Sequence, residues 1–478
     1  MFDIIYVYFF IERGNNVNKY KKLAGDTLIF SIGSFSSKIL SFLLVKLYTA
    51  YMIKADYSVA NQLQSLVNLL GPVVTLSISE SVLRYGLRKD IPKNKVYSTG
   101  VMTGVTGIAT GMIVLWIIAS LTRFRSYLPL MMMLLITSEF RWIQQQYVKA
   151  KNQIKLYTVD SLLSCVSLVL FSVLLIIVFR LSITGYILSI VLSDLCSILF
   201  LVYFSRSRGD FSPQNIDPKL RKSMIRYSVP LIPTTVLWWV VSSSDLFMVS
   251  KFLGDDINGL YSVAYKIPNL ISFGAVIFFR AWQISAITEY GTSESREYFT
   301  KVLDAYVSLM FLGSAGIMLF LELFTKIITS EEYWESFRMA PFLVIAILMQ
   351  SFCNFLSSFY NASGKNHKSL STSAVAAGVN LALNLILIPI VKVQGAAFAT
   401  MAAYLVCFAI RLVDTQRLAK YSVEWNKLGI NMCLLMLMAI VILADAKFMY
   451  VWLTAAFIGV VAVNIRSVIN TARKLVGR

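Results

Sequence analysis

Long apolar segments separated by short polar joints run along almost the whole chain. Most are close to the roughly 20 residues with which an α-helix crosses about 30 Å of hydrocarbon, where a helix satisfies its own backbone hydrogen bonds. The pattern therefore predicts an all-α polytopic membrane protein with about fourteen transmembrane helices. The expected spans are residues 24–45, 57–80, 97–120, 126–148, 158–179, 183–204, 227–250, 259–283, 300–321, 337–360, 369–390, 394–415, 428–446 and 448–465.

Composition supports a membrane protein, because 57% of the 478 residues are hydrophobic and only 14% are charged, whereas a soluble domain is about half apolar. The five cysteines lie inside apolar spans without paired spacing, and the chain has one histidine. We therefore expect no disulfide frame, no metal site and no cofactor. The first apolar stretch is too short to cross and lacks the features of a signal peptide, so residues 1–16 are interpreted as an interfacial segment or an over-extended start.

The net charge of +19 follows the membrane topology. With the N-terminus inside, cytoplasmic segments hold 30 of the 44 Lys and Arg residues and outer loops hold ten. Basic residues collect in cytoplasmic loops of membrane proteins. Both termini are therefore predicted to be cytoplasmic, and the basic charge does not call for a nucleic-acid partner.

The chain contains an internal repeat. The tetrapeptide YSVA opens the second span at Tyr57 and the eighth at Tyr261, an offset of 204 residues, and Gly185 and Gly395 open the sixth and twelfth spans. Six spans thus repeat as six, which gives two parallel lobes with substrate expected between them. The predicted parts are a cytoplasmic N-terminal segment (1–23), a first lobe (24–205), a cytoplasmic linker (206–226), a second lobe (227–415), and two additional spans with a cytoplasmic tail (416–478).

A few charged residues lie inside the predicted spans, where each costs about 2.5 to 3.5 kcal/mol on insertion scales and usually faces a bundle interior or a watery cavity. The repeat offset places Lys38 one helical turn from the level of Asp245. We expect Lys38, Asp245 and Lys266 to converge on the outer half of a cavity whose inner half is lined by Arg141 and Arg280.

Two interpretations are open for each of these charged residues. Asp245 is either a member of a buried ion pair, with Lys266 or Lys38 as its partner, or a protonatable switch. The four cations either form a wall that binds phosphate, with Arg giving forked contacts and Lys a point charge, or extend toward lipid head groups.

Other polar or aromatic residues carry weaker predictions. Glu139 and Asp194 are expected to pair with neighbouring helices, and Glu80 and Arg84 lie at the cytoplasmic end of the second span. Tryptophans near the predicted cavity serve in packing or in an interfacial belt more often than as sugar platforms. The tryptophans concerned are Trp238, Trp239 and Trp282, with Trp239 and Trp282 kept as candidate site residues.

The stretch RYSVPLIPTTVLWWVVSSSDLFMVSKFLG, followed by GLYSVAYKIPNL and FRAWQISAI, resembles the Wzx-like oligosaccharide flippases. These form the polysaccharide transporter branch of the multidrug/oligosaccharidyl-lipid/polysaccharide (MOP) exporter superfamily. ESVLRY, NQIKLYT and YNASGKNHKSL fit the same pattern, so the likeness covers most of the chain. Two positions depart from it: Leu246 follows Asp245 where the family often has Arg, and Tyr265 stands where Asn often precedes the lysine.

The resemblance implies a MATE/MurJ-like fold in the cytoplasmic (inner) membrane. It implies a flippase that moves undecaprenyl-diphosphate-linked repeat units to the outer leaflet for O-antigen or other lipopolysaccharide, capsule or exopolysaccharide synthesis. It also implies that the lipid-linked substrate is exchanged against H+ or Na+ by alternating access. The expected protein partners are the polysaccharide polymerase and the chain-length machinery. A MATE-type drug or cation exporter is the nearest alternative, for which we expect an acidic cavity.

An enzyme, such as a membrane-bound polysaccharide polymerase, is the alternative from another class. It would be expected to carry a large outer loop with catalytic Arg or His, and the predicted outer loops are short and free of histidine. No GxxxxGK[ST] phosphate loop occurs either, which argues against ATP hydrolysis. The sequence therefore predicts a transporter and not an enzyme.

Overall fold

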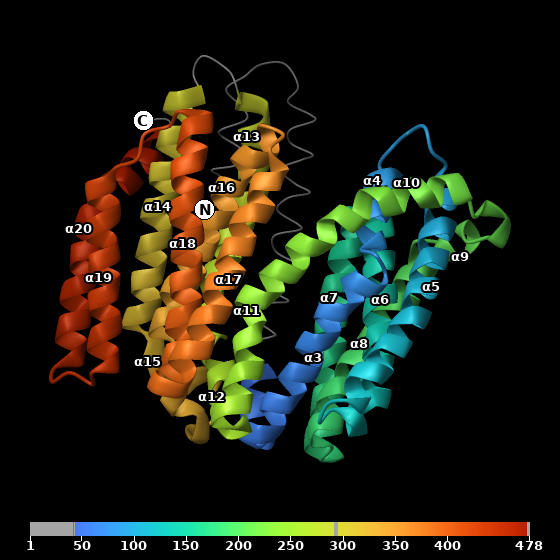
Figure 1. The fold of residues 1–478 in the computed structure, drawn as a ribbon, viewed down its shortest axis with the longest axis horizontal. Coiled ribbons are helices and arrows are strands. Elements are labelled where there is room, and N and C mark those ends of the chain that lie inside the picture. Colours follow the sequence, from blue (N-terminus) through green and yellow to red (C-terminus); the bar gives the residue numbers. More distant parts are fainter. Residues whose placement is uncertain (1–41, 43, 291–294, 476–478) are drawn as a thin grey trace. The chain divides into compact units, whose positions relative to one another are not determined.

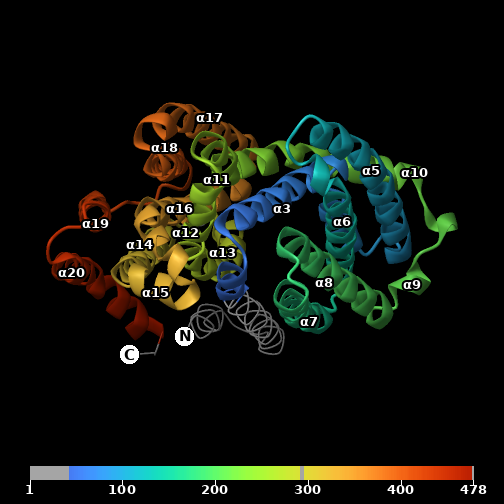
Figure 2. The same cartoon turned by 90° about the horizontal axis from the view of Figure 1, so that it is seen from below.

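The computed structural model describes residues 42, 44–290 and 295–475, and every regular element within these residues is a helix. The chain divides into two compact units, with the division between Trp239 and Val240. We call the described residues up to Trp239 the N-terminal unit and those from Val240 the C-terminal unit (Figures 1 and 2).

The N-terminal unit is a bundle in which α6 contacts α3, α4, α5, α7 and α8. Within it α8 packs closely on both α6 and α7. The π-helical turn η2 continues α7, and the short 3-10 helices η1, η3 and η4 join longer helices. The elements are α3 (Lys54–Val74), α4 (Ile78–Gly86), α5 (Lys93–Ser120), η1 (Arg125–Tyr127), α6 (Leu128–Ala150), α7 (Ile154–Ser172), η2 (Val173–Val178), α8 (Ser182–Phe204), α9 (Ser207–Asp210), η3 (Pro213–Asn215), α10 (Pro218–Ser228), η4 (Val229–Leu231) and the first part of α11 (Ile232–Leu253).

A sharp bend of 57° separates α3 from α4. Pro72 lies in the last turn of α3 and lacks a backbone N–H. Leu76 and Ser77 then have positive φ values of 55° and 50°, a left-handed conformation that cannot continue a right-handed helix. The second predicted span, 57–80, is therefore two helices that meet at an angle.

The C-terminal unit is organised around α16, which is buried along almost its whole length. Helices α13 and α18 pack against it, α17 packs on α18, and α14 packs against α20. Figure 1 shows α19 and α20 as a hairpin beside α14. The elements are the second part of α11, α12 (Asp255–Ala264), α13 (Asn269–Glu289), α14 (Ser295–Leu319), α15 (Leu321–Ile328), η5 (Glu331–Met339), α16 (Pro341–Ala362), α17 (Asn366–Val391), α18 (Val393–Ala419), α19 (Trp425–Leu443) and α20 (Met449–Leu475).

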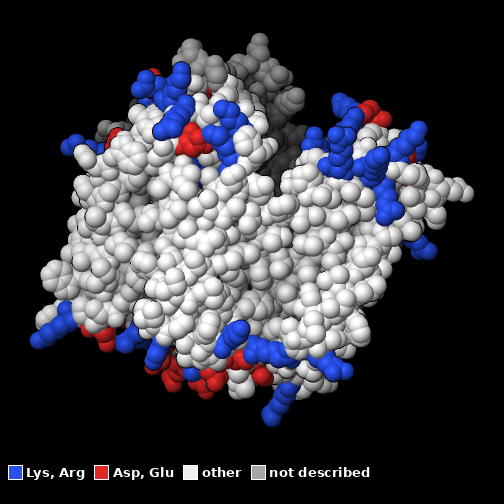
Figure 3. Space-filling view, viewed as in Figure 1, with Lys and Arg blue, Asp and Glu red and all other residues white. Residues whose placement is uncertain are grey.

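The helices fit a multi-pass membrane protein. Within the part of the chain that the structure describes, ten helices are long and apolar enough to cross a membrane, or eleven spans if α3 and α4 together count as one. Figure 3 shows charged side chains gathered at the ends of the helices of each unit, with an uncharged band between them. The all-α polytopic fold is therefore confirmed.

The count of fourteen spans stays a prediction. Every predicted span from the second onward overlaps one to three consecutive helices. The first, 24–45, lies almost entirely outside the described residues. Helix α6, which carries Glu139, Arg141 and Lys149, is not among the ten, and the eighth span is interrupted between α12 and α13 near Pro268.

The predicted linker, 206–226, is bonded to the N-terminal unit. The Asp210 carboxylate accepts hydrogen bonds of 2.8 Å from both Tyr147 and Lys151 of the α6 end. Ser81 of α4 donates to the Met224 carbonyl at 2.6 Å. Helix α10 starts at an Asp217 N-cap, where the N–H groups of Leu220 and Lys219 hold the pKa of the carboxyl below its usual range. The linker thus forms part of the first unit, and the division between units falls inside α11.

Candidate functional site

Two of the four cations predicted to line a cavity fall outside what the structure describes: all of Lys38 and the side chain of Arg280. The other two are described in different units, Arg141 in α6 and Lys266 in the bend after α12, where it is half-buried. The convergence of Lys38, Asp245 and Lys266 therefore stays a prediction.

Asp245 of α11 is completely buried and is surrounded by hydroxyl groups. Its Oδ2 accepts hydrogen bonds from Tyr261 at 2.8 Å, Tyr265 at 2.5 Å and Thr400 of α18 at 3.2 Å. Its Oδ1 accepts the Leu246 N–H at 2.9 Å. Hydrogen bonds to a carboxylate are stronger than neutral ones and spread its charge. Asp245 thus joins α11 to the α12 segment and to α18.

A chain of amide and hydroxyl groups extends this cluster into α17. Asn380 donates to the Thr400 hydroxyl at 3.2 Å and accepts from Ser244 at 3.3 Å and from Asn384 at 3.0 Å. The side-chain oxygen of Asn384 is buried without a hydrogen-bond partner in the structure. One carboxylate with neutral amide and hydroxyl oxygens is a donor set suited to a proton or to a hard cation such as Na+.

Asp245 makes no ion pair with Lys266 among the described residues, because every contact of its carboxylate runs to a hydroxyl or a backbone N–H. The structure therefore shows no pair with Lys266 in this conformation, and the alternative partner, Lys38, lies outside the described residues. Tyr265, one of the two positions at which the sequence departs from the expected pattern, supplies one of these contacts. The reading of Asp245 as a protonatable or ion-binding switch stays a prediction.

Arg141 forms an ion pair inside the N-terminal unit. Its Nη1 lies 2.6 Å from Oδ1 of Asp194 on α8, and the Arg141 side chain keeps 24% of its exposure while Asp194 keeps 4%. Nearby on α7, Asp160 accepts from Gln145 at 2.9 Å and from Ser197 at 2.5 Å. Asp194 therefore pairs with a neighbouring helix as expected, whereas the Arg141 cation is already neutralised by a carboxylate. Its role in binding phosphate stays a prediction.

Glu139 lies on a different side of α6 from Arg141, because residues two positions apart in a helix point about 200° apart around its axis. Its Oε2 accepts the Thr75 hydroxyl at 3.0 Å, and it is buried against the last turn of α3. A Cβ added to Gly71 would overlap the Glu139 carboxyl group. Only glycine therefore allows this carboxyl to lie directly on the α3 backbone, beside the bend between α3 and α4.

Three further predicted site residues, Glu80, Arg84 and Trp239, contact neighbouring helices of the N-terminal unit. The Glu80 carboxylate lies 3.4 Å from the Gln146 amide, and the Arg84 guanidinium lies 4.0 Å from the centre of the Tyr227 ring. Trp239 donates to the carbonyl and hydroxyl oxygens of Ser65 on α3, each at 3.0 Å. These contacts hold the helices of the N-terminal unit together.

Trp282 of α13 is buried, and its indole stacks on Phe355 of α16 with ring centres 4.3 Å apart. The indole N–H donates to the Phe355 carbonyl at 3.1 Å. These contacts favour the packing role over a sugar platform. The role of Trp239 and Trp282 in sugar binding has no support among the contacts described.

Arg411 was missed as a buried residue, because the sequence places it at the cytoplasmic end of the twelfth span. It is completely buried in α18. Its guanidinium donates to the Cys353 carbonyl of α16 at 2.9 Å and to the Thr372 and Ser373 hydroxyls of α17 at 2.9 and 3.0 Å. The sequence offered only a modest signal, because the predicted span 394–415 extends one turn beyond Arg411, and in the structure α18 continues to Ala419.

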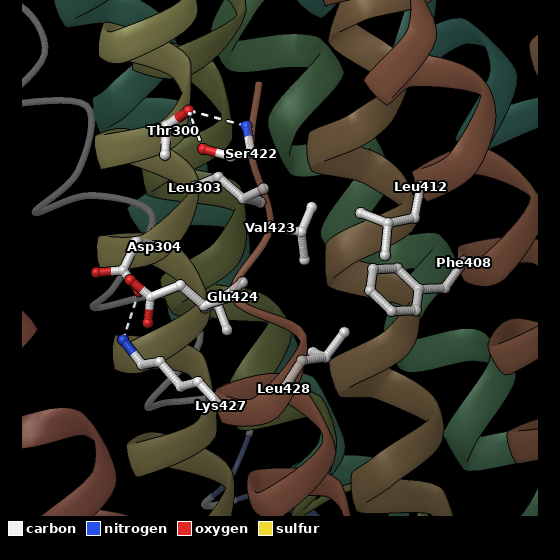
Figure 4. A pocket seen from close by; sticks show the side chains of 11 residues that line it. Thr300, Leu303, Asp304, Phe408, Leu412, Ser422, Val423, Glu424, Lys427 and Leu428 are labelled. Atoms are coloured by element: carbon white, nitrogen blue, oxygen red, sulfur yellow. Dashed lines mark hydrogen bonds and ion pairs between the residues drawn. The ribbon is translucent and has the colours of Figure 1, made fainter. Parts of the chain in front are cut away.

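A pocket between α14, α18 and α19 contains a second buried cation that the sequence did not single out (Figure 4). Lys427, only 8% exposed, forms an ion pair with Asp304 of α14 and donates to Ser467 of α20 at 2.7 Å. Phe408, Leu412 and other apolar side chains form the rest of the wall. The two C-terminal helices are thereby tied to α14 by charge as well as by apolar packing.

Comparison with known proteins identifies the family of this chain and similar folds. Residues 23–283, more than half of the chain, match the family model described as polysaccharide biosynthesis protein. The chain belongs to this family. No curated protein sequence matches the chain significantly.

Three solved structures show the fold. An inward closed conformation of the lipid II flippase MurJ aligns with a TM-score of 0.68 at 14% identity, over 94% of this chain and 100% of that one. An inward-facing multidrug resistance MATE transporter of the MOP superfamily aligns with a TM-score of 0.65 at 15% identity, over 82% and 100%. A MOP superfamily transporter from Pyrococcus furiosus, described as having a binding pocket of reverse polarity, aligns with a TM-score of 0.59 at 15% identity, over 82% of this chain and 95% of that one. The matched folds are those of transporters and flippases and not of enzymes.

Proposed function

We propose that this protein is a flippase that moves undecaprenyl-diphosphate-linked oligosaccharide units from the cytoplasmic to the outer leaflet of the inner membrane. The observation that carries the proposal is the match of residues 23–283 to the polysaccharide biosynthesis family in a chain with a multi-pass transporter fold. The units serve the synthesis of a surface polysaccharide: O-antigen, capsule or exopolysaccharide. Both termini lie in the cytoplasm, and the flipped unit is handed to the polymerase and chain-length machinery.

The substrate sets the chemical demands. A diphosphate cannot enter hydrocarbon without cations, and buried or cavity-facing Lys and Arg residues are its natural partners. Lys266 is the principal described cation for this role, with Lys38 and Arg280 as further members. Arg141 contributes when the diphosphate displaces Asp194 from its guanidinium.

Asp245 is the coupling residue of the proposal. Its Oδ2 accepts three hydroxyl hydrogen bonds that join α11 to α12 and α18. A protonated oxygen becomes a donor, so uptake of H+ there breaks or reverses at least one of these bonds. Na+ binds the same carboxylate oxygens in competition with these hydroxyl groups, and the unpartnered side-chain oxygen of Asn384 supplies a further ligand. Either ion thereby changes how α11 is held.

The test is transport of a fluorescent or radiolabelled undecaprenyl-diphosphate oligosaccharide in proteoliposomes, followed by its accessibility on each leaflet. We expect wild-type protein to move it, Lys266→Ala to lower the initial rate at least about tenfold, which corresponds to about 1.4 kcal/mol, and Lys251→Ala, an exposed lysine on α11, to leave it unchanged. Asp245→Asn should abolish the dependence on an imposed H+ or Na+ gradient, and the exposed Asp256→Asn should not.

Two outcomes would point elsewhere. Movement of organic cations but not of the lipid-linked unit would favour the drug exporter. In cells lacking the protein, outer-leaflet units that accumulate without being polymerised would favour the polymerase. Replacing the H+ gradient by a Na+ gradient of equal size identifies the coupling ion.

A further inference from the structure

Four carboxyl groups are buried within helices of the described part of the chain, and they differ in the hydrogen-bond donors around them. Asp245 has four donors. Asp194 has a guanidinium, and Asp160 has an amide and a hydroxyl. Glu139 has one, the Thr75 hydroxyl at 3.0 Å. A buried carboxylate is tolerated when cations or several donors compensate it, so Glu139 is the member least suited to carry a charge.

The charged groups on the surrounding helices are engaged elsewhere. Arg141, on the same helix, points away toward Asp194 of α8. Asp160 of α7 is bonded to α6 and α8, Glu80 of α4 to Gln146, and Asp56 of α3 to Ser182. Arg84 of α4 lies on the Tyr227 ring. The charged residues of α5, Lys93 and Lys95, lie in its first turn. Among the described residues none of them bonds to Glu139.

A neutral Glu139 completes a continuous line of hydrogen bonds. Thr75 has one hydroxyl proton, and two acceptors lie within its reach, the Gly71 carbonyl at 2.8 Å and Glu139 at 3.0 Å. When Glu139 is protonated it donates to the Thr75 oxygen, and Thr75 donates to Gly71, so every proton is used. When Glu139 is ionised, its two oxygens share at most that one proton. The geometry favours the protonated form.

The position of Glu139 connects its proton to the shape of the chain. Its carboxyl group occupies the space where a side chain at residue 71 would begin, immediately before Pro72 and the 57° bend between α3 and α4. Burial against the α3 backbone with a single hydrogen-bond donor is unfavourable for an anion. The proton can therefore leave only when the α3–α4 bend moves and admits water.

We propose that Glu139 is a proton-binding site that is occupied in this conformation and that releases its proton to water when the α3–α4 bend opens. The inference deepens the proposed function, because it makes H+ a transported or coupled ion at a second carboxyl group besides Asp245. The step is a simple acid dissociation: the Glu139 O–H bond breaks, its proton passes to water, and the carboxylate is solvated.

Infrared difference spectroscopy of the full-length protein in lipid, without substrate, tests the site. We expect the C=O band of a protonated carboxylic acid at neutral pH, lost in Glu139→Gln and retained in the matched control Glu80→Gln. Thr75→Val should shift the band because the acceptor of the Glu139 proton is gone, while Thr75→Ser should restore it. Gly71→Ala, which displaces the carboxyl from α3, should remove the band at neutral pH.

The readouts separate the two proposals. A band that is absent from the wild type, or that survives in Glu139→Gln and stays unmoved in Thr75→Val, overturns the proton site whatever the protein transports. A band that behaves as expected, in a protein that does not move lipid-linked oligosaccharide, keeps the proton site and removes the flippase. In an active flippase, Glu139→Gln should abolish the acceleration of flipping by a pH gradient, and Glu80→Gln should retain it.

Discussion

Two three-helix groups, α6 to α8 in the N-terminal unit and α16 to α18 in the C-terminal unit, pack in the same way but differ in how each holds an arginine. In each, the third helix packs closely on both of the others. Arg141 of the first group is paired with a carboxylate, Asp194. Arg411 of the second group directs its guanidinium to a carbonyl and several hydroxyl oxygens. One arrangement compensates charge with charge, and the other disperses it over many neutral dipoles.

The difference bears on what each group can do. A pair of opposite charges can exchange partners, since either member binds another ion of the right sign. A guanidinium with bonds to two neighbouring helices can leave them only by breaking several hydrogen bonds together. We therefore expect the first group to be adjustable and the second to be a fixed frame, against which the Asp245 cluster on α11, α12 and α18 is positioned.

The largest expected effect is at Arg411. Arg411→Met should lower the free energy of unfolding by more than about 3 kcal/mol, because bonds to a charged donor each contribute about 1.5 to 3 kcal/mol and several are lost together. Denaturant unfolding in mixed micelles, followed by tryptophan fluorescence, measures this. Arg411→Lys, which keeps the charge but not the planar fork, should recover less than half of the loss. Full recovery by lysine would mean that charge alone matters there.

Breaking the ion pair should cost less. Arg141→Met leaves Asp194 buried without its cation, and we expect a loss of about 2 to 3 kcal/mol, below the 3 to 5 kcal/mol of a fully buried pair because Arg141 is partly exposed. The double variant Arg141→Met, Asp194→Leu should regain most of the stability. The same unfolding experiment measures both, and a double variant as unstable as the single one would contradict the exchangeable-pair view.

The attachment of the C-terminal hairpin gives an intermediate effect. Lys427→Met removes the bonds to Asp304 and Ser467, and we expect a loss of about 1 to 2 kcal/mol. Hydrogen exchange should rise in α19 and α20 and not in α16. Lys420→Met, at an exposed position just after α18, is the matched control. Equal effects of the two variants would remove Lys427 as an anchor.

The smallest expected effect is at Asp160. Asp160→Asn keeps the shape and one acceptor oxygen, so it should cost only about 1 kcal/mol, the range of one hydrogen bond. If the first group depends on a carboxylate network and not on the Arg141 pair alone, the loss will approach that of Arg141→Met. The unfolding midpoints of the two variants, measured side by side, decide between these possibilities.

Hydropathy was sufficient to predict the fold, because the length of an apolar segment directly reflects the bilayer. The predicted spans from the second onward coincide with helices, although the bend after Pro72 and the break near Pro268 divide two of them. A proline inside a span indicates a possible interruption but not its angle.

The partners of buried charges were harder to predict. Sequence position gives the depth of a residue in the membrane, but not the side of the helix that faces a given neighbour. Arg141 and Asp194 were both recognised, yet their pairing joins residues 53 positions apart. Arg411 lies inside the predicted span 394–415 but was not singled out, because its place near the end of the span gave no sign of the partners that bury it. The position of the Glu139 carboxyl against Gly71 depends on a tertiary contact between two helices, which the hydrophobic periodicity of the sequence does not reveal.

The inclusion of α10 and the first part of α11 in the N-terminal unit has a consequence for synthesis. Chains fold from the N-terminus as they emerge, largely unit by unit. The sixth span ends near Phe204, but the unit extends to Trp239, whose indole bonds to Ser65. The first unit therefore cannot be completed in the translocon until half of the next span has been made, and a gene split after residue 205 should yield an unfinished first fragment.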